Sequence, residues 1–456
     1  MKIFPIRALL LLMIPGLIMT GACKKTFFTD VNSNPNVLNT VTPTLLLPTV
    51  EGALGYTQGG DLSRFSALLM QQMYGANSQS QQYYAYNFNP GVFDNVWPDL
   101  YTSTLENNYT LMKISDAGGY NTYAGISRII MAYTLQVMVD IWGDLPYSQA
   151  FQGNADNAIF HPTYDKALGL YDSIASLINV GSALLQSSSP GSLVPATDDV
   201  IYGGNAKAWI AFGHAIKARL AIHQSKGNAA MASTALAEIA QSFTQNSDGA
   251  VYTFASTQSA ANSWYQFYRD RPGDENFKSS TLAINMLATG DPRYSAFNMD
   301  STASNGAATS YYNKINSPTE FITYDELLFM SAEATLRSSG NIAAAQTLYQ
   351  SAITNNMLKL GVAQGAINTY LTTYGTLPTT VDAAISKVAA QEFIALFLNP
   401  EAWVVWRRTG SPSLQSVTSG ASIPRRLLYP QTEINFNGAN VPQNVTLVSP
   451  PIFWDH

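Results

Sequence analysis

The sequence of 456 residues is poor in the residue types on which most metal and catalytic sites depend. It has one cysteine, Cys23, and four histidines, His161, His214, His223 and His456, and no two of these histidines have the spacing of a zinc-ligand pair on one helix. A lone cysteine cannot form an intramolecular disulfide, which excludes the disulfide-stabilised class of small secreted domains. The sequence also lacks a nucleophile elbow, a phosphate-binding glycine loop and a dinucleotide fingerprint. It therefore predicts a protein that is not an enzyme and that needs no cofactor and no metal.

Charge is scarce as well, because charged residues make up only 12% of the chain. The 24 Lys and Arg residues against 30 Asp and Glu give a net charge of −6, and no long basic run occurs. Nucleic-acid binding depends on cations that neutralise phosphates, so this balance excludes a nucleic-acid partner. The abundant Asn, Gln, Ser, Thr and Tyr indicate a neutral polar surface. Such a surface suits uncharged polar ligands, although it is also typical of any extracytoplasmic protein with low surface charge.

The N-terminus has the pattern of a lipoprotein signal peptide. Lys2 and Arg7 precede an apolar run at residues 8–19, and small residues lead to Cys23. The apolar run is shorter than the ~20 residues that a membrane-spanning helix needs, and no other stretch is long and apolar enough. We therefore expect residues 1–22 to be removed and Cys23 to be lipidated. The alternative is an ordinary signal peptide beside an incidental thiol.

The rest of the chain has mainly helical periodicity. Residues 23–60 are rich in Asn, Pro, Thr and Gly and are predicted to be a lipidated tether that wraps onto the body, whereas residues 61–456 are predicted to form a single helical domain. Asp61 or Ser63 is expected to cap a helix through Tyr74. Residues 324–357 form a helical hairpin that resembles a tetratricopeptide unit, with 204–226 and 229–245 as the next pair. Strand signals are few and short, as at 251–254, and long polar loops join the helices.

Aromatic residues among polar amides mark the candidate ligand site. One cluster occupies residues 81–89 and another residues 264–271, with a smaller one at 311–313. Stacked rings beside amide donors and acceptors are what a carbohydrate or peptide site requires. Alternatively, these rings pin their loops to the core. The predicted ligand contacts are Tyr83, Tyr84, Tyr86, Trp264, Tyr265 and Arg269.

Paired carboxylates leave one enzymatic alternative open. Glycosidases use two carboxyl groups that flank the scissile bond, and carboxylates distant in sequence can meet in space. The carboxylates to examine are Glu392 with Glu401, or Asp270, Asp274 and Glu275. Helix capping and ion pairing are the alternative roles for each of them.

Several short motifs, in this order, resemble the SusD/RagB family of nutrient-binding outer-membrane lipoproteins, in its SusD-like branch. The motifs are DVNSNPN at 30–36, WPDLY at 97–101, DIWGDLPY at 140–147, DPR at 291–293, AEA at 332–334, EAW at 401–403, RRTG at 407–410, RR at 425–426, YP at 429–430 and Glu433. The resemblance spans nearly the whole mature chain. It implies a helical fold with tetratricopeptide-like pairs and a lid over a SusC-like TonB-dependent transporter in the outer membrane of Bacteroidota. These motifs are mostly structural, so the resemblance carries over no ligand residue.

The function predicted from the sequence is capture of a nutrient oligomer, either glycan or peptide, by a lipid-anchored outer-membrane protein that faces the cell exterior. Its expected partners are the transporter, the oligomer and the membrane. Two alternatives remain, a lipid-anchored glycan hydrolase and a helical-repeat scaffold that binds other proteins.

Overall fold

The computed structural model describes residues 41–153, 157–187, 192–300 and 310–456. The predicted signal peptide at 1–22 and the lipidation site at Cys23 lie outside the described residues. The chain divides into two units, Met1–Thr42 and Pro43–His456, and every element described below belongs to the second.

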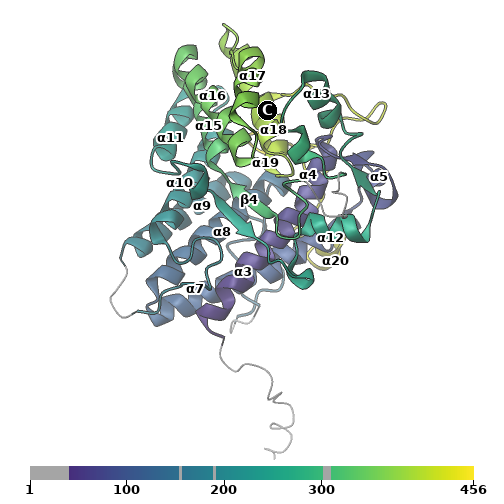
Figure 1. Cartoon of the computed structure of the whole chain (residues 1–456). Coiled ribbons are helices and arrows are strands. Elements are labelled where there is room, and N and C mark those ends of the chain that lie inside the picture. Colours follow the sequence, from purple (N-terminus) through teal and green to yellow (C-terminus); the bar gives the residue numbers. More distant parts are fainter. Residues whose placement is uncertain (1–40, 154–156, 188–191, 301–309) are drawn as a thin grey trace, which may run out of the picture. The chain divides into compact units, whose positions relative to one another are not determined.

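The second unit is mainly helical, as the periodicity predicts (Figure 1). Its α-helices are α3 (Pro43–Thr57), α4 (Ser63–Leu69), α5 (Ser78–Tyr84), α6 (Val96–Pro98), α7 (Asn107–Gly118), α8 (Asn121–Trp142), α9 (Ala167–Gln186), α10 (Ala206–His223), α11 (Ala229–Ile239), α12 (Ser263–Asp270), α13 (Thr281–Thr289), α14 (Tyr294–Phe297), α15 (Tyr324–Ser339), α16 (Ile342–Lys359), α17 (Gln364–Tyr374), α18 (Val381–Ala395), α19 (Glu401–Thr409) and α20 (Gln431–Phe436). In the described ranges the structure also contains two π-helical segments, η2 (Gln58–Leu62) and η4 (Asp99–Glu106), and the 3-10 turns η3 (Pro90–Phe93), η5 (Asn246–Asp248) and η6 (Gln258–Ala260).

The predicted helical hairpins are confirmed. Helices α15 and α16 pack against each other, and Gly340 ends α15 with a left-handed φ of 66° that favours glycine. The Asn341 side chain then accepts a hydrogen bond from the Ala344 amide at 3.0 Å and so caps α16. Helices α10 and α11 form the second predicted pair. A separate apolar cluster, which includes residues of α15, α16 and α18, fills the first hairpin.

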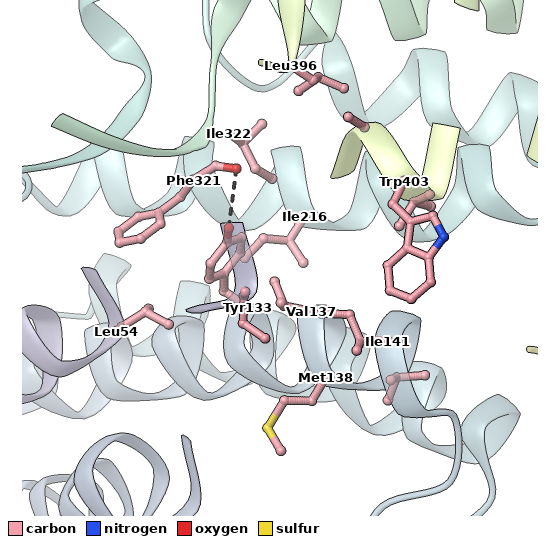
Figure 2. Close-up of a cluster of buried hydrophobic side chains, with 14 of the residues drawn as sticks. Leu54, Tyr133, Val137, Met138, Ile141, Ile216, Phe321, Ile322, Leu396 and Trp403 are labelled. Atoms are coloured by element: carbon pink, nitrogen blue, oxygen red, sulfur yellow. Dashed lines mark hydrogen bonds between the residues drawn. The ribbon is translucent and has the colours of Figure 1, made fainter. Parts of the chain in front are cut away.

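Helix α8 is the centre of the main core. In Figure 2, Tyr133 on α8 lies among apolar side chains from several other elements, and its hydroxyl donates to the Phe321 carbonyl at 3.3 Å. The sequence predicted that no stretch beyond the N-terminal one is long and apolar enough to span a membrane. That prediction is wrong, because α8 and α9 both have the necessary length and composition. For α8, 94% of the apolar window is buried in protein, which is the burial of a core helix.

Strands are few and short in the described chain, as expected. Strand β2 (Ala250–Thr253) pairs antiparallel with β4 (Pro318–Ile322), and β1 (Tyr74–Gly75) pairs antiparallel with β3 (Glu275–Asn276). The second pair connects two predicted ligand-binding segments, because β1 leads into α5 and β3 follows α12. It joins two segments that are about 200 residues apart in the sequence.

Candidate functional site

The two main aromatic segments predicted from the sequence meet in space. Strands β1 and β3 pair Tyr74 with Asn276 and Gly75 with Glu275, and Figure 1 shows α5 and α12 on the same side of the unit. Next to this pair, the Ser78 hydroxyl donates to an Asp274 carboxylate oxygen at 3.1 Å. The surface that carries α5 and α12 is therefore one continuous region, which we call the α5–α12 face.

Arg64 on α4 holds this face together. Its Nε donates to Glu275 Oε1 at 3.0 Å, and one of its terminal nitrogens donates to the Ser80 hydroxyl at 3.2 Å. The guanidinium carbon also lies 3.9 Å from the ring centre of Phe267. Burial raises the pKa of Glu275, and the Arg64 charge opposes that shift. Arg64 thus supplies the counter-charge for a buried carboxylate and fixes α4, α5 and α12 to one another.

Three of the six predicted contact residues are buried. Tyr83 and Tyr86 are 8% exposed and Trp264 is 3% exposed. The Trp264 indole donates to the Ser63 hydroxyl at 2.9 Å, and Tyr83 stacks on Phe88 with ring centres 5.0 Å apart. Such burial favours the alternative that these rings anchor their segments in the core, and it leaves little ring surface for a ligand.

The other three predicted residues have surface available. Tyr84 and Tyr265 are half-buried and Arg269 is exposed. Tyr84 lies edge-on to Tyr74 at 5.0 Å, and Arg269 forms two hydrogen bonds, of 2.6 and 2.8 Å, with neighbouring Asp270. Their contact with a ligand stays a prediction, and they are the members of the set that a ligand can reach without displacing the core.

A hollow of about 420 Å³, here called the acidic hollow, opens between α3, η2 and η4, and α12 packs against η2. It is lined by Ala53, Tyr56, Thr57, Gly60, Asp61, Asp99 and Ser103. Asp61 belongs to η2 and the other carboxylate, Asp99, belongs to η4. Partial burial and the Asp61 charge raise the pKa of Asp99. π-Helical turns occur frequently at functional sites, and here two of them supply the two carboxylates of one hollow.

Sequence reasoning missed this hollow. The sequence predicted only a helix-capping role for Asp61. In the structure the helical conformation is interrupted at Gly60, whose ψ of −107° is not helical. Ser263, the first residue of α12, contacts one of the lining residues, since its hydroxyl donates to the Tyr56 carbonyl at 3.3 Å. The glycine pair at 59–60 directly before an acid was the available signal.

The carboxylates that the hydrolase alternative requires do not line the acidic hollow. Glu392 is buried, and burial raises its pKa well above the usual value. Glu401 is buried too and bonds to His223. Asp270 and Asp274 are paired with arginines, and Glu275 with Arg64. Each of the last four has the ion-pairing or hydrogen-bonding role that was the alternative to catalysis.

One buried group has the composition of a metal site. Asp140, His223 and Glu401 have ligand-type atoms that all lie within 4.8 Å of one another. These atoms are already hydrogen-bonded: His223 Nε2 lies 2.8 Å from Glu401 Oε1, and the Tyr171 hydroxyl lies 2.5 Å from Asp140 Oδ1 and 2.9 Å from His223 Nδ1. Burial lowers the pKa of His223, but the Glu401 and Asp140 charges outweigh it and raise the pKa. The two carboxylates thus favour the protonated form of the His223 imidazole.

Comparison with known proteins identifies relatives of the whole unit. A family model named SusD-like and described as "Starch-binding associating with outer membrane" matches residues 35–430. No curated protein matches the chain.

Among solved structures, a SusD/RagB family protein from Bacteroides thetaiotaomicron is 21% identical, with a TM-score of 0.72 over 91% of this chain and 99% of that one. A chitin-binding protein is 21% identical, with a TM-score of 0.75 over 91% and 100% of the two chains. A chitin-binding SusD homolog from Flavobacterium johnsoniae is 19% identical, with a TM-score of 0.68 over 91% and 97%. At these identities the likeness establishes the fold.

Proposed function

Since the chain belongs to the SusD-like family of nutrient-binding proteins associated with the outer membrane, we propose that it captures nutrient oligomers at the cell surface and delivers them to a SusC-like TonB-dependent transporter. In this role the protein is a lid that closes over the transporter, and it binds its cargo without cleaving it. The cargo is a glycan or a peptide oligomer.

The acidic hollow is the observation that carries this proposal. Asp61, Asp99 and Ser103 offer hydrogen-bond acceptors and a hydroxyl, and the Tyr56 ring offers an apolar wall. An uncharged polar oligomer presents hydroxyl or amide donors around apolar faces, and this combination of side chains can bind both. The volume of about 420 Å³ lies in the range of small-molecule sites and accommodates one or two units of an oligomer. Tyr265 and Arg269 belong to α12, which packs against η2, and we propose that they contact further units of the oligomer.

The anchor is the second part of the proposal. Cys23, exposed by removal of residues 1–22, would carry the lipid that holds the protein to the outer membrane on its exterior face. Several acyl chains together give stable anchoring, because each buried CH₂ contributes about 0.8 kcal/mol. Mass spectrometry of the membrane-extracted protein would detect the added acyl mass, which a Cys23→Ala variant would lack.

The test is the affinity of the full-length chain in detergent for maltoheptaose, chitohexaose and a blocked neutral hexapeptide, with product analysis after long incubation. The Asp61→Asn, Asp99→Asn double variant probes the hollow. Asp382→Asn, at an exposed position on α18, is the matched control. We expect one class of oligomer to bind without turnover, and the double variant to bind it at least tenfold more weakly.

Three outcomes would count against the proposal. Product formation that the double variant abolishes would assign the raised-pKa carboxyl of Asp99 to acid catalysis and favour a hydrolase. Full affinity in the double variant would place the cargo elsewhere. Silence on every probe would favour the protein-binding scaffold.

A further inference from the structure

A second hollow of about 420 Å³ lies on the other side of η4, and we call it the phenylalanine groove. Its walls include Tyr101, Glu106, Phe151, Phe160, Glu433 and Phe436. The two hollows use different residues of the same helical stretch. Asp99 and Ser103 line the acidic hollow, whereas Pro98, Thr102 and Glu106 line the groove. The two sites can therefore be changed independently.

Two of the groove's rings are unusually exposed. Phe160 is 74% and Phe436 76% exposed, more than any other large apolar side chain of the described residues. Exposed apolar area costs about 25 cal/mol per Å², and contiguous patches mark interaction sites. Both rings line the groove although 276 positions separate them in the sequence.

Hydrogen bonds hold these rings in place. The Asn437 amide donates to the Pro162 carbonyl at 2.9 Å, and the Tyr164 hydroxyl donates to Glu433 Oε2 at 2.8 Å. The segment that carries Phe160 is thus tied to α20, the helix that ends at Phe436. The exposure of both rings is a fixed feature of the fold and does not come from an untethered loop.

Phe151 shows a further sign of a built site. Its φ of 61° is left-handed, which for a bulky residue costs roughly 1–3 kcal/mol and persists only where the surroundings enforce it. The ring stacks on Tyr109 with centres 5.2 Å apart. Strain of this kind clusters at ligand-binding positions.

The charged residues described in the lining of the groove are acidic. Among the described residues, the lining of the groove contains Glu106 and Glu433 but no Lys, Arg, His, Asn or Gln. The Glu106 side chain has no hydrogen bond or ion pair with any described residue. Two lining hydroxyl donors are already used, since Tyr101 donates to the Pro146 carbonyl at 2.8 Å and Thr432 to Asp94 Oδ1 at 3.0 Å. The groove thus offers carboxylate acceptors and ring faces, and few free donors.

We propose that the phenylalanine groove binds peptide segments in which an arginine side chain adjoins an apolar residue. A guanidinium has only donors, stacks on aromatic rings and pairs with carboxylates in a bidentate way, so it complements every feature of the groove. Sugar hydroxyls both donate and accept hydrogen bonds, and the lining residues that the structure describes include no side-chain amide or cation that could donate to a sugar oxygen. The groove therefore selects a cationic peptide over a neutral glycan.

The test compares two blocked tripeptides on the full-length chain in detergent: acetyl-Leu-Arg-Leu-amide and its citrulline analogue, which has nearly the same shape without the charge. We expect the arginine peptide to bind at least tenfold more tightly, with an affinity that falls as salt rises. Phe436→Ala and Glu106→Gln should each weaken it at least tenfold. The matched controls are Ile284→Ala, an exposed apolar position on α13, and Asp382→Asn, and both should leave the affinity unchanged.

Four results would overturn the proposal: equal affinity for the two peptides, no binding of the arginine peptide, full affinity in Phe436→Ala, or tighter groove-dependent binding of chitohexaose. The last would assign the groove to glycans. The Asp61→Asn, Asp99→Asn variant should bind the arginine peptide normally. Failure of this inference and failure of the proposed nutrient site are therefore distinguishable.

Discussion

The α5–α12 face and the phenylalanine groove contain similar rings in opposite settings. On the α5–α12 face, Trp264 and Tyr83 are buried, and the arginine beneath them is paired with Glu275. In the groove, Phe160 and Phe436 are exposed, and Glu106 has no cationic partner in the described chain. The difference teaches that clustering of aromatics in the sequence reports core anchors as readily as ligand contacts. An unpaired charge beside an exposed ring is the stronger sign of a binding surface.

The largest effect on stability is expected from removing a ring that anchors the core of the α5–α12 face. Trp264→Ala should destabilise the protein by about 3–5 kcal/mol, because it leaves a cavity and deprives the Ser63 hydroxyl of its indole donor. Denaturant unfolding followed by circular dichroism measures this loss. A change below about 1 kcal/mol would mean that the ring is not a core anchor and would restore it as a ligand contact.

The next largest effect comes from the counter-charge of the α5–α12 face. Arg64→Met should cost about 3 kcal/mol, because it leaves Glu275 buried without its partner. The loss should depend on pH. A carboxyl whose folded pKa is raised stabilises the fold below its unfolded pKa, and that contribution disappears as pH rises through the folded value. Without Arg64 the folded pKa rises further, so the variant should lose more stability toward neutral pH than in acid.

The double variant Arg64→Met, Glu275→Gln is the control for this effect. It removes both charges, so it should recover much of the stability that the single variant loses and should show no such pH dependence. A single variant as stable as the native protein at pH 7 would contradict the assigned role of Arg64.

These predictions also show where the sequence is sufficient. The hairpin of α15 and α16 follows from local periodicity, a turn glycine and a capping asparagine, all within about 36 residues. Residues 43–57 look like a tether because Pro, Thr and Gly interrupt them, yet they form α3 with Pro48 inside it. Burial of Leu46, Leu47, Val50 and Leu54 against the body outweighs that local preference.

Long-range geometry is the part that the sequence could not supply. Two-residue strands such as β1 and β3 have no periodicity to detect, so the meeting of the two aromatic segments was not foreseeable from pattern. The direction of each ring depends on distant neighbours: Tyr83 is buried because Phe65 packs against it with ring centres 5.4 Å apart. The phenylalanine groove combines segments near residues 100, 150, 160 and 433, and no single segment has a distinctive pattern.

A smaller effect is expected on the pH dependence of ligand affinity, which should distinguish the acidic hollow from the groove. The pKa of Asp99 is raised by partial burial and by Asp61, so Asp99 takes up a proton at a higher pH than an ordinary aspartate. If Asp99 accepts hydrogen bonds from the nutrient, affinity at the acidic hollow should fall several-fold as pH drops through that raised pKa. Asp99→Asn should remove this step from the pH profile of binding. An unchanged profile would remove Asp99 from the nutrient site.

The smallest predicted effect is also the most discriminating. Phe436 is mostly exposed at the end of the short helix α20, so Phe436→Ala should change the unfolding free energy by no more than about 0.5 kcal/mol. The same substitution should weaken arginine-peptide binding at least tenfold. A core ring cannot combine these results, because its removal affects folding before it affects a ligand. Measuring stability and peptide affinity on the same preparation tests the assignment directly. A loss of stability comparable to that of Trp264→Ala would show that Phe436 anchors the fold, as the buried rings of the α5–α12 face do, and is not a ligand contact.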